Sequence, residues 1–165
     1  MKNRLLLIIL ASFVSLFSYA QKINLSSWEQ YEIRTVQVGS DGTKFVKVWG
    51  TGGNIDKAMK QAAKNAVHAC IFKGLPASAN ANATPALFRE GNLNPEQKKY
   101  FEAFFKNKGD YLQFINITTD KVPSGKDALK VRWGYEVAVY VQVLFDNLRD
   151  KLEEDGMIKK LNEGF

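Results

Sequence analysis

The sequence predicts a single α+β domain in which an alanine-rich helix packs on one face of an antiparallel sheet of about four strands. Two strand-like segments, residues 28–38 and 44–49, flank a glycine-rich turn, which is typical of a β-hairpin. Residues 129–143 alternate apolar and polar side chains, as expected for a strand with one covered face. Residues 54–73 carry a small side chain at every fourth position, so a helix there could lie close to a sheet.

The first two strands are joined by a predicted β-turn. Residues 39–42 read Gly-Ser-Asp-Gly, and an Asp-Gly pair at the tip is a strong hairpin signal. The alternation of the strand before this turn changes phase at Thr35 and Val36, so we expect a β-bulge there.

Residues 54–73 form the clearest predicted helix. Asn54 is a competent N-cap, and Asp56 lies in the first turn, where the helix dipole favours an acid. Gly74 is suited to end the helix. The small side chains predicted to face the sheet recur every four residues: Ala58, Ala62, Ala66 and Cys70.

Residues 75–93 are rich in Ala, Asn, Ser and Pro and are predicted to be a long inserted loop. Connections of this length in compact domains are usually functional or disordered. An inserted helix is expected to follow, with Asn94 as its cap, Pro95 at its first position and Gln97 completing a capping box. The apolar stripe of this helix consists of Tyr100, Phe101, Phe104 and Phe105.

The remainder of the chain is predicted to complete the sheet. Residues 111–119 are expected to form the third strand, after which Pro and Gly within residues 122–126 turn the chain. Residues 129–143 are predicted to form one long strand. Residues 144–154, with a leucine at every fourth position, are expected to form a C-terminal helix.

Residues 1–20 have the composition of a signal peptide. Lys2 and Arg4 precede an apolar run, and small residues lead up to a cleavage site after Ala20. The run is shorter than the roughly 20 apolar residues of a membrane span, and no cysteine follows it for lipid attachment. We expect an exported chain, periplasmic or associated with the outer envelope, whose mature part is residues 21–165 and which is not stably inserted in a membrane. An uncleaved N-terminal anchor is the alternative.

The charge of the mature chain does not favour a nucleic-acid partner. Without the leader there are 21 basic and 17 acidic residues, a net charge of +4, and the basic residues are scattered among apolar and acidic ones. Nucleic-acid binding requires a concentrated basic surface. The chain has one cysteine, Cys70, so no intrachain disulfide can form, and its apolar neighbours predict a buried side chain.

The glycines before the predicted helix raise the question of a phosphate-binding loop. Gly50 and Gly52 fit the first and third positions of a dinucleotide fingerprint, but the sixth position is Ile55. The Gly-Lys-Ser/Thr sequence of a P-loop is absent. We therefore expect Gly52 and Gly53 to let the chain turn sharply before the helix and predict no cofactor, with anion binding at the helix start as the alternative.

The sequence offers no local catalytic or metal-binding motif. Its one histidine, His68, is two residues from Cys70, and residues two apart on a helix do not face each other. Zinc sites need clusters of His and Cys. We predict no catalytic residue and no metal ligand, although a carboxylate pair formed only in the fold stays open for the acids Glu90, Glu96, Glu136 and Glu153.

The glycine pair, the alanine helix and the last strand carry a resemblance to a known family. The matching residues are Gly50, Gly52, Ala58, Ala62, Ala66 and the strand from Tyr135 to Val143. In these residues the chain resembles bacterial envelope domains of the small surface-lipoprotein type and of the N-terminal type of the flagellar T-ring assembly protein. The resemblance implies an assembly or scaffold role without catalytic residues. The chain departs from the family in lacking a lipid-bearing cysteine and in inserting residues 75–110.

These observations together predict a non-enzymatic exported protein of the bacterial cell envelope that binds or scaffolds an envelope protein partner. One alternative is a small hydrolase that uses two carboxylates brought together by the fold, which would face each other in an apolar cleft. The other is a secreted enzyme inhibitor that presents the loop of residues 75–93.

The residues predicted to contact a partner lie in the inserted loop and helix. Isolated aromatic and arginine side chains dominate the binding energy of many interfaces. The candidate residues are Leu87, Phe88, Arg89, Tyr100 and Phe104. The competing interpretation is that Leu87 and Phe88 only fix the loop to the domain.

Overall fold

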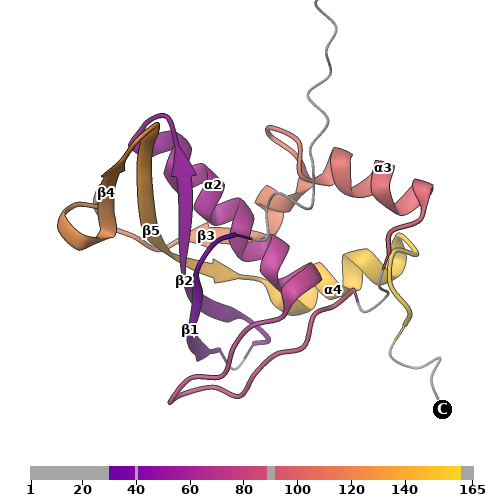
Figure 1. Cartoon of the computed structure of the whole chain (residues 1–165). Helices are drawn as coiled ribbons and strands as arrows, with labels where there is room; N and C mark the ends of the chain where they lie inside the picture. Colours follow the sequence, from indigo (N-terminus) through magenta and orange to yellow (C-terminus); the bar gives the residue numbers. More distant parts are fainter. Residues whose placement is uncertain (1–29, 40, 89–91, 161–165) are drawn as a thin grey trace, which may run out of the picture.

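The computed structural model describes residues 30–39, 41–88 and 92–160, and these form an α+β fold, as predicted (Figure 1). The sheet is antiparallel throughout and has the strand order β1-β2-β5-β3, with β4 also paired to β5. Its five strands are β1 (Ile33–Val38), β2 (Lys44–Gly52), β3 (Ile115–Ile117), β4 (Ala128–Val131) and β5 (Gly134–Val143). The described α-helices are α2 (Ile55–His68), α3 (Pro95–Phe104) and α4 (Phe145–Glu154). The predicted signal peptide lies outside the described residues.

Helix α2 lies across one face of the sheet, against β2 and β5 (Figure 1). Its predicted small-residue face is confirmed, because Ala58, Ala62 and Ala66 are fully buried. The close approach also depends on Gly50 in β2. A Cβ atom at this position would collide with the backbone nitrogen of Ala62 and lie 2.6 Å from the carbonyl oxygen of Ala58.

The first hairpin has the predicted bulge and turn. The pairing of β1 with β2 shifts register between Thr35 and Gln37, which leaves Val36 as the extra residue. At the turn the Gly39 N–H donates to the carbonyl of Thr43 over 2.9 Å, and Gly42 adopts a positive φ of 73°. Glycine adopts such a conformation without steric cost.

The helix predicted over residues 54–73 begins as expected and ends differently. The Asn54 side chain accepts a hydrogen bond of 2.8 Å from the Lys57 N–H. Regular α-helix stops at His68, and Ala69–Lys73 forms a wider π-helical turn before Gly74. The backbone carbonyls of Cys70 and Ile71 in this turn accept hydrogen bonds from the following loop. The sequence pattern could not indicate these contacts, because they join segments distant in the chain.

The inserted loop is folded back on itself as far as Phe88. Leu75 pairs with Thr84 through two backbone hydrogen bonds of 2.7 and 2.9 Å. Its end is held on the π-helical turn, where the N–H groups of Leu87 and Phe88 donate to the carbonyls of Cys70 and Ile71 over 3.0 and 2.8 Å. This part of the loop is therefore tied to the domain by its backbone.

The prediction of a strand over residues 111–119 is wrong in its first half. Asp110–Phe114 is a 3₁₀ helix, and only Ile115–Ile117 pairs as β3. The reason is the three-residue spacing of Tyr111 and Phe114, which places both rings on the aromatic side chains at the end of α3, at 5.9 Å from Phe105 and 6.0 Å from Phe104.

The prediction of one long strand over residues 129–143 is also wrong. The chain turns at Arg132 and Trp133, so that β4 and β5 form a hairpin. Gly134 makes this possible with a φ of 148°, and a Cβ atom there would collide with the carbonyl of Gly52. Because Val131 pairs with Gly134, the turn puts Leu129 and Val131 on the opposite face of the sheet from Tyr135 and Val137. Leu129 and Val131 are therefore exposed, whereas Val137 is buried.

The C-terminal helix is confirmed as α4, and the chain after it folds back. Gly156 has a φ of 70°, and the Met157 N–H donates to the carbonyl of Leu152 over 2.8 Å. Helix α3 contacts this end through Tyr100, whose hydroxyl donates to Asp155 over 2.6 Å. Over the described residues, no helix is both long and apolar enough to cross a membrane.

Candidate functional site

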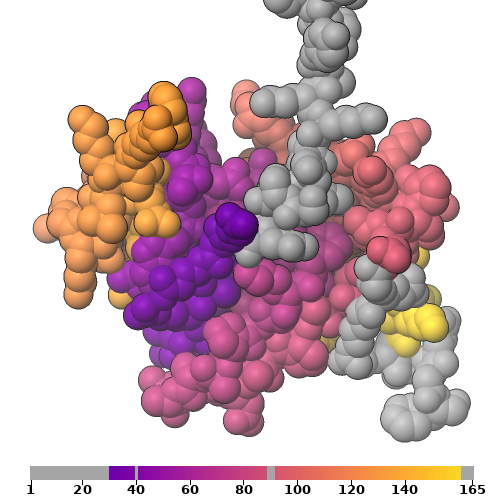
Figure 2. All heavy atoms as spheres, in the orientation of Figure 1, coloured from indigo at the N-terminus to yellow at the C-terminus, as the bar shows by residue number. Residues whose placement is uncertain are grey.

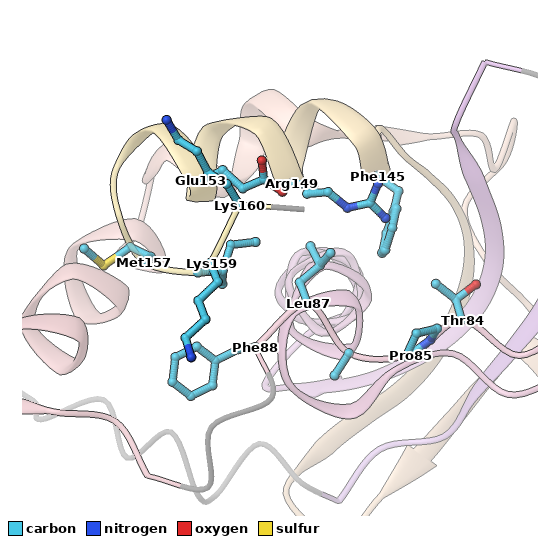
Figure 3. A pocket seen from close by; sticks show the side chains of 12 residues that line it. Thr84, Pro85, Leu87, Phe88, Phe145, Arg149, Glu153, Met157, Lys159 and Lys160 are labelled. Carbon is cyan, nitrogen blue, oxygen red and sulfur yellow. The ribbon is translucent and has the colours of Figure 1, made fainter. Parts of the chain in front are cut away.

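A hollow of about 470 Å³ lies between the end of the inserted loop, α4 and the chain that follows α4 (Figure 3). We call it the α4 groove. Its walls come from three segments that the fold brings together: Thr84, Pro85, Ala86, Leu87, Phe88, Phe145, Arg149, Glu153, Met157, Ile158, Lys159 and Lys160. The volume falls within the range of small-ligand pockets, roughly 300–1,000 Å³.

The bottom of the groove is apolar. Leu87 points from the loop toward α4, and Phe145 projects from the first turn of the helix toward it (Figure 3). Phe88 is buried, with its ring centroid 5.8 Å from that of Phe72 and 6.1 Å from that of Phe101. Because these rings also belong to the core, the bottom of the groove is held rigidly by the rest of the fold.

The rim of the groove is basic. Arg149, Lys159 and Lys160 line it together with one acid, Glu153. Arg149 stacks over the Phe145 ring at 5.0 Å, and its contact with Asp146 is a long one of 3.5 Å on the surface. Neither lysine has an ion pair among the described residues, so their charges are available to a ligand.

The structure places the predicted partner-binding residues in different surroundings. Leu87 and Phe88 line the groove, whereas Arg89 lies outside the described residues. Tyr100 is engaged by Asp155, and Phe104 is buried in the core between α3 and the 3₁₀ helix. A role of these five residues in partner binding stays a prediction.

The sequence reasoning missed the rim of the groove. Phe145, Arg149 and Glu153 are four residues apart and therefore share one face of α4. This spacing, together with Lys159 and Lys160 just beyond the end of the helix, is the sequence pattern that could have indicated the rim. Without the fold, nothing connected this signal to the loop that closes the other side.

His68 and Cys70 are buried and do not form a catalytic pair. Burial, reinforced by the charge of Lys73, lowers the pKa of His68 to about 4. Its Nδ1 atom shares a hydrogen bond of 2.8 Å with the hydroxyl of Tyr31. Burial raises the pKa of the Cys70 thiol to about 12, so the thiol is uncharged at neutral pH, and the predicted burial of this cysteine is confirmed.

The glycines before α2 allow the helix to pack closely on the sheet. A Cβ atom at Gly52 would collide with the backbone nitrogen of Ala58, because the first turn of α2 lies directly on this strand. The side chain of Asn54 occupies one of the free N–H groups at the helix start. Gly50 and Gly52 therefore serve the close approach of helix to sheet, a different role from the sharp turn that the sequence predicted at Gly52 and Gly53.

Two partly buried carboxylates, Asp127 and Asp155, each form an ion pair with a lysine. Asp127 accepts from Lys47 over 2.6 Å, and Asp155 accepts from Lys151 over 2.7 Å as well as from Tyr100. The hydrogen bonds from Lys151 and Tyr100 lower the pKa of Asp155. Within the described part of the chain, no group of three or more His, Cys, Asp or Glu side chains is placed to hold a metal ion.

Comparison of the chain with protein-family models, curated proteins and solved structures finds no match. The resemblance to bacterial envelope domains therefore rests on the glycines, alanines and strand residues named above.

Proposed function

We propose that the chain is an exported, non-enzymatic protein of the bacterial cell envelope that binds or scaffolds another envelope protein through the α4 groove. The proposal joins two observations. The signal-peptide composition of residues 1–20 supports export. The groove, with an apolar bottom and a basic rim on a rigid support, supports binding and is the observation that carries the proposal.

Charge and polarity of the groove support, as the partner, a protein segment that carries acidic and apolar side chains. Three cations against one acid at the rim attract carboxylates. Leu87, which is half-buried, offers apolar contact below them. A segment with an acid beside a large apolar residue can contact the basic rim and the apolar bottom of the groove at the same time.

The hydrolase alternative receives less support from this geometry. Paired-carboxylate chemistry needs two acids near the substrate, and Glu153 is the one carboxylate among the described residues that line the groove. Binding requires no further group there.

Charge reversal at the rim tests the proposal. The exported protein carrying Lys159→Glu and Lys160→Glu is expected to capture its partner from its own envelope at least about tenfold less well, because attraction becomes repulsion. The matched control is Lys98→Glu with Lys99→Glu, an exposed adjacent pair on α3 that makes the same change in net charge. Affinity capture followed by quantitative mass spectrometry gives the ratio.

Three results support the proposal when found together: loss with the rim variant, retention with the control, and an acidic-apolar binding segment in the captured protein. Equal loss with both variants would show a general charge effect, and unchanged capture with both would remove the groove from the interface. Because all four lysines are exposed, both variants are expected to melt within about 0.5 kcal/mol of the unmodified protein.

A further inference from the structure

The β4–β5 hairpin and the loop before it expose four large apolar side chains away from the α4 groove. Trp133 at the hairpin turn is 82% exposed and Val122 in the preceding loop is 68% exposed. Leu129 and Val131 on β4 are 49% and 40% exposed. We call these four residues the hairpin patch. Exposed apolar clusters of this kind mark interaction surfaces.

The hairpin patch lies on a projecting part of the molecule. In Figure 1, β4 and the loop leading into it lie at the opposite end of the molecule from α3, and the space-filling view shows the same segment standing out from the body (Figure 2). Within the described chain, β4 pairs with β5 alone, so its other edge carries no strand. A flat surface can therefore reach the patch without meeting the helices.

Basic side chains alternate with the apolar ones along β4, so Lys130 lies on the opposite face of this edge strand from Leu129 and Val131. The exposed cations of the segment are Lys121, Lys126, Lys130 and Arg132. Arg132 lies over the Trp133 ring at 5.0 Å. The hairpin and the loop before it also carry three acids, Asp120, Asp127 and Glu136. Asp127 is paired with Lys47 over 2.6 Å, and the four cations outnumber the other two acids. Glu136 pairs with Leu129 and lies on the same face as Leu129 and Val131.

We infer that the hairpin patch docks peripherally on an anionic phospholipid bilayer. Tryptophan prefers the interface between headgroups and acyl chains, and lysine and arginine keep their charges in the headgroup layer while their aliphatic parts contact apolar neighbours. Each cation near an anionic membrane surface adds to the attraction.

The same composition fits a protein partner less well. Protein interfaces are depleted in lysine, and their anchors are received by complementary pockets. Here the same segment carries three lysines, and Trp133 in the hairpin turn is 82% exposed. The fluid surface of a bilayer needs no complementary shape. This surface is separate from the groove, so the inference does not depend on the proposed function.

Vesicle co-sedimentation of the exported protein tests the inference. Binding is expected to vesicles of phosphatidylglycerol and phosphatidylcholine in equal parts, to weaken as salt is raised, and to be undetectable with phosphatidylcholine alone. Trp133→Ser is expected to weaken binding about tenfold, and Lys130→Glu with Arg132→Glu by at least about thirtyfold.

Two controls separate this surface from others. Leu112→Ser removes an apolar side chain that is 46% exposed on the 3₁₀ helix and is expected to leave vesicle binding unchanged. The rim variant Lys159→Glu with Lys160→Glu is also expected to bind vesicles normally. Three results would overturn the inference: no binding to anionic vesicles, equal binding to neutral ones, or hairpin substitutions that abolish self-association or protein capture while leaving vesicle binding intact.

Discussion

Replacing Gly50 by alanine is expected to lower the free energy of unfolding by about 3 kcal/mol. The added methyl group would collide with the backbone of Ala62 and approach the carbonyl of Ala58, so α2 would have to move away from β2. Backbone atoms cannot turn aside as a flexible side chain can, and the fully buried alanine face of the helix would lose its contacts. Urea denaturation followed by circular dichroism measures the difference.

Gly53→Ala is the matched control for this substitution. It makes the same chemical change three residues away, but a Cβ atom at Gly53 meets nothing within 4 Å. Its effect is expected to stay within about 0.5 kcal/mol. Equal stability of the two variants would mean that α2 does not lie as close to β2 as the structure shows.

Acidification is expected to remove about 3 kcal/mol of stability through His68. Its pKa is about 4 in the folded protein and near 6.5 when unfolded, because the folded side chain is buried and faces the charge of Lys73. Between these pH values the unfolded chain binds more protons than the folded one, so stability falls as the pH drops from 6.5 to 4. Above pH 6.5 the contribution is fully present.

His68 is the only histidine, which makes this pH dependence separable from other titrations. His68→Gln keeps a polar side chain beside the Tyr31 hydroxyl but cannot titrate. The difference in unfolding free energy between pH 7 and pH 5, measured by urea denaturation, is expected to shrink in this variant. An identical pH profile for the variant and the unmodified protein would contradict the assignment to His68.

The elements that the sequence predicted well are those defined by local chemistry. Asn54 and Asn94 cap their helices by accepting from the backbone N–H three residues later, at 2.8 and 2.9 Å. The bulge beside Val36 showed itself as a break in the alternation. Such features need only a few neighbouring residues, so they can be predicted without knowledge of the tertiary contacts.

The errors arose where a pattern was compatible with two structures. Apolar side chains at Val131, Trp133 and Tyr135 predict one strand with a single apolar face, but in the hairpin Val131 lies on the opposite face from Tyr135 and is exposed. The sequence predicts Tyr111 and Phe114 in a strand, whereas the structure has them three residues apart on a 3₁₀ helix, where both rings pack on the aromatic residues at the end of α3. Contacts distant in sequence decided both cases.

The candidate site was only partly predictable for the same reason. Leu87 and Phe88 stood out because they are apolar within a polar loop, and both line the groove. The rim residues Arg149, Lys159 and Lys160 have the composition of an ordinary solvated helix end. They acquire a role when the chain after α4 folds back beside the loop, which is a property of the tertiary structure.

Site-specific photo-crosslinking in the intact envelope tests the central claim, that a partner occupies the α4 groove, most directly. A photoreactive residue in place of Ile158, which lines the groove, is expected to trap one partner protein through an acidic-apolar segment identified by mass spectrometry. The adduct is expected to disappear when Lys159→Glu and Lys160→Glu are added, and to be absent when the photoreactive residue replaces Leu112 instead. No adduct from the groove position, or the same adduct from Leu112, would contradict the claim.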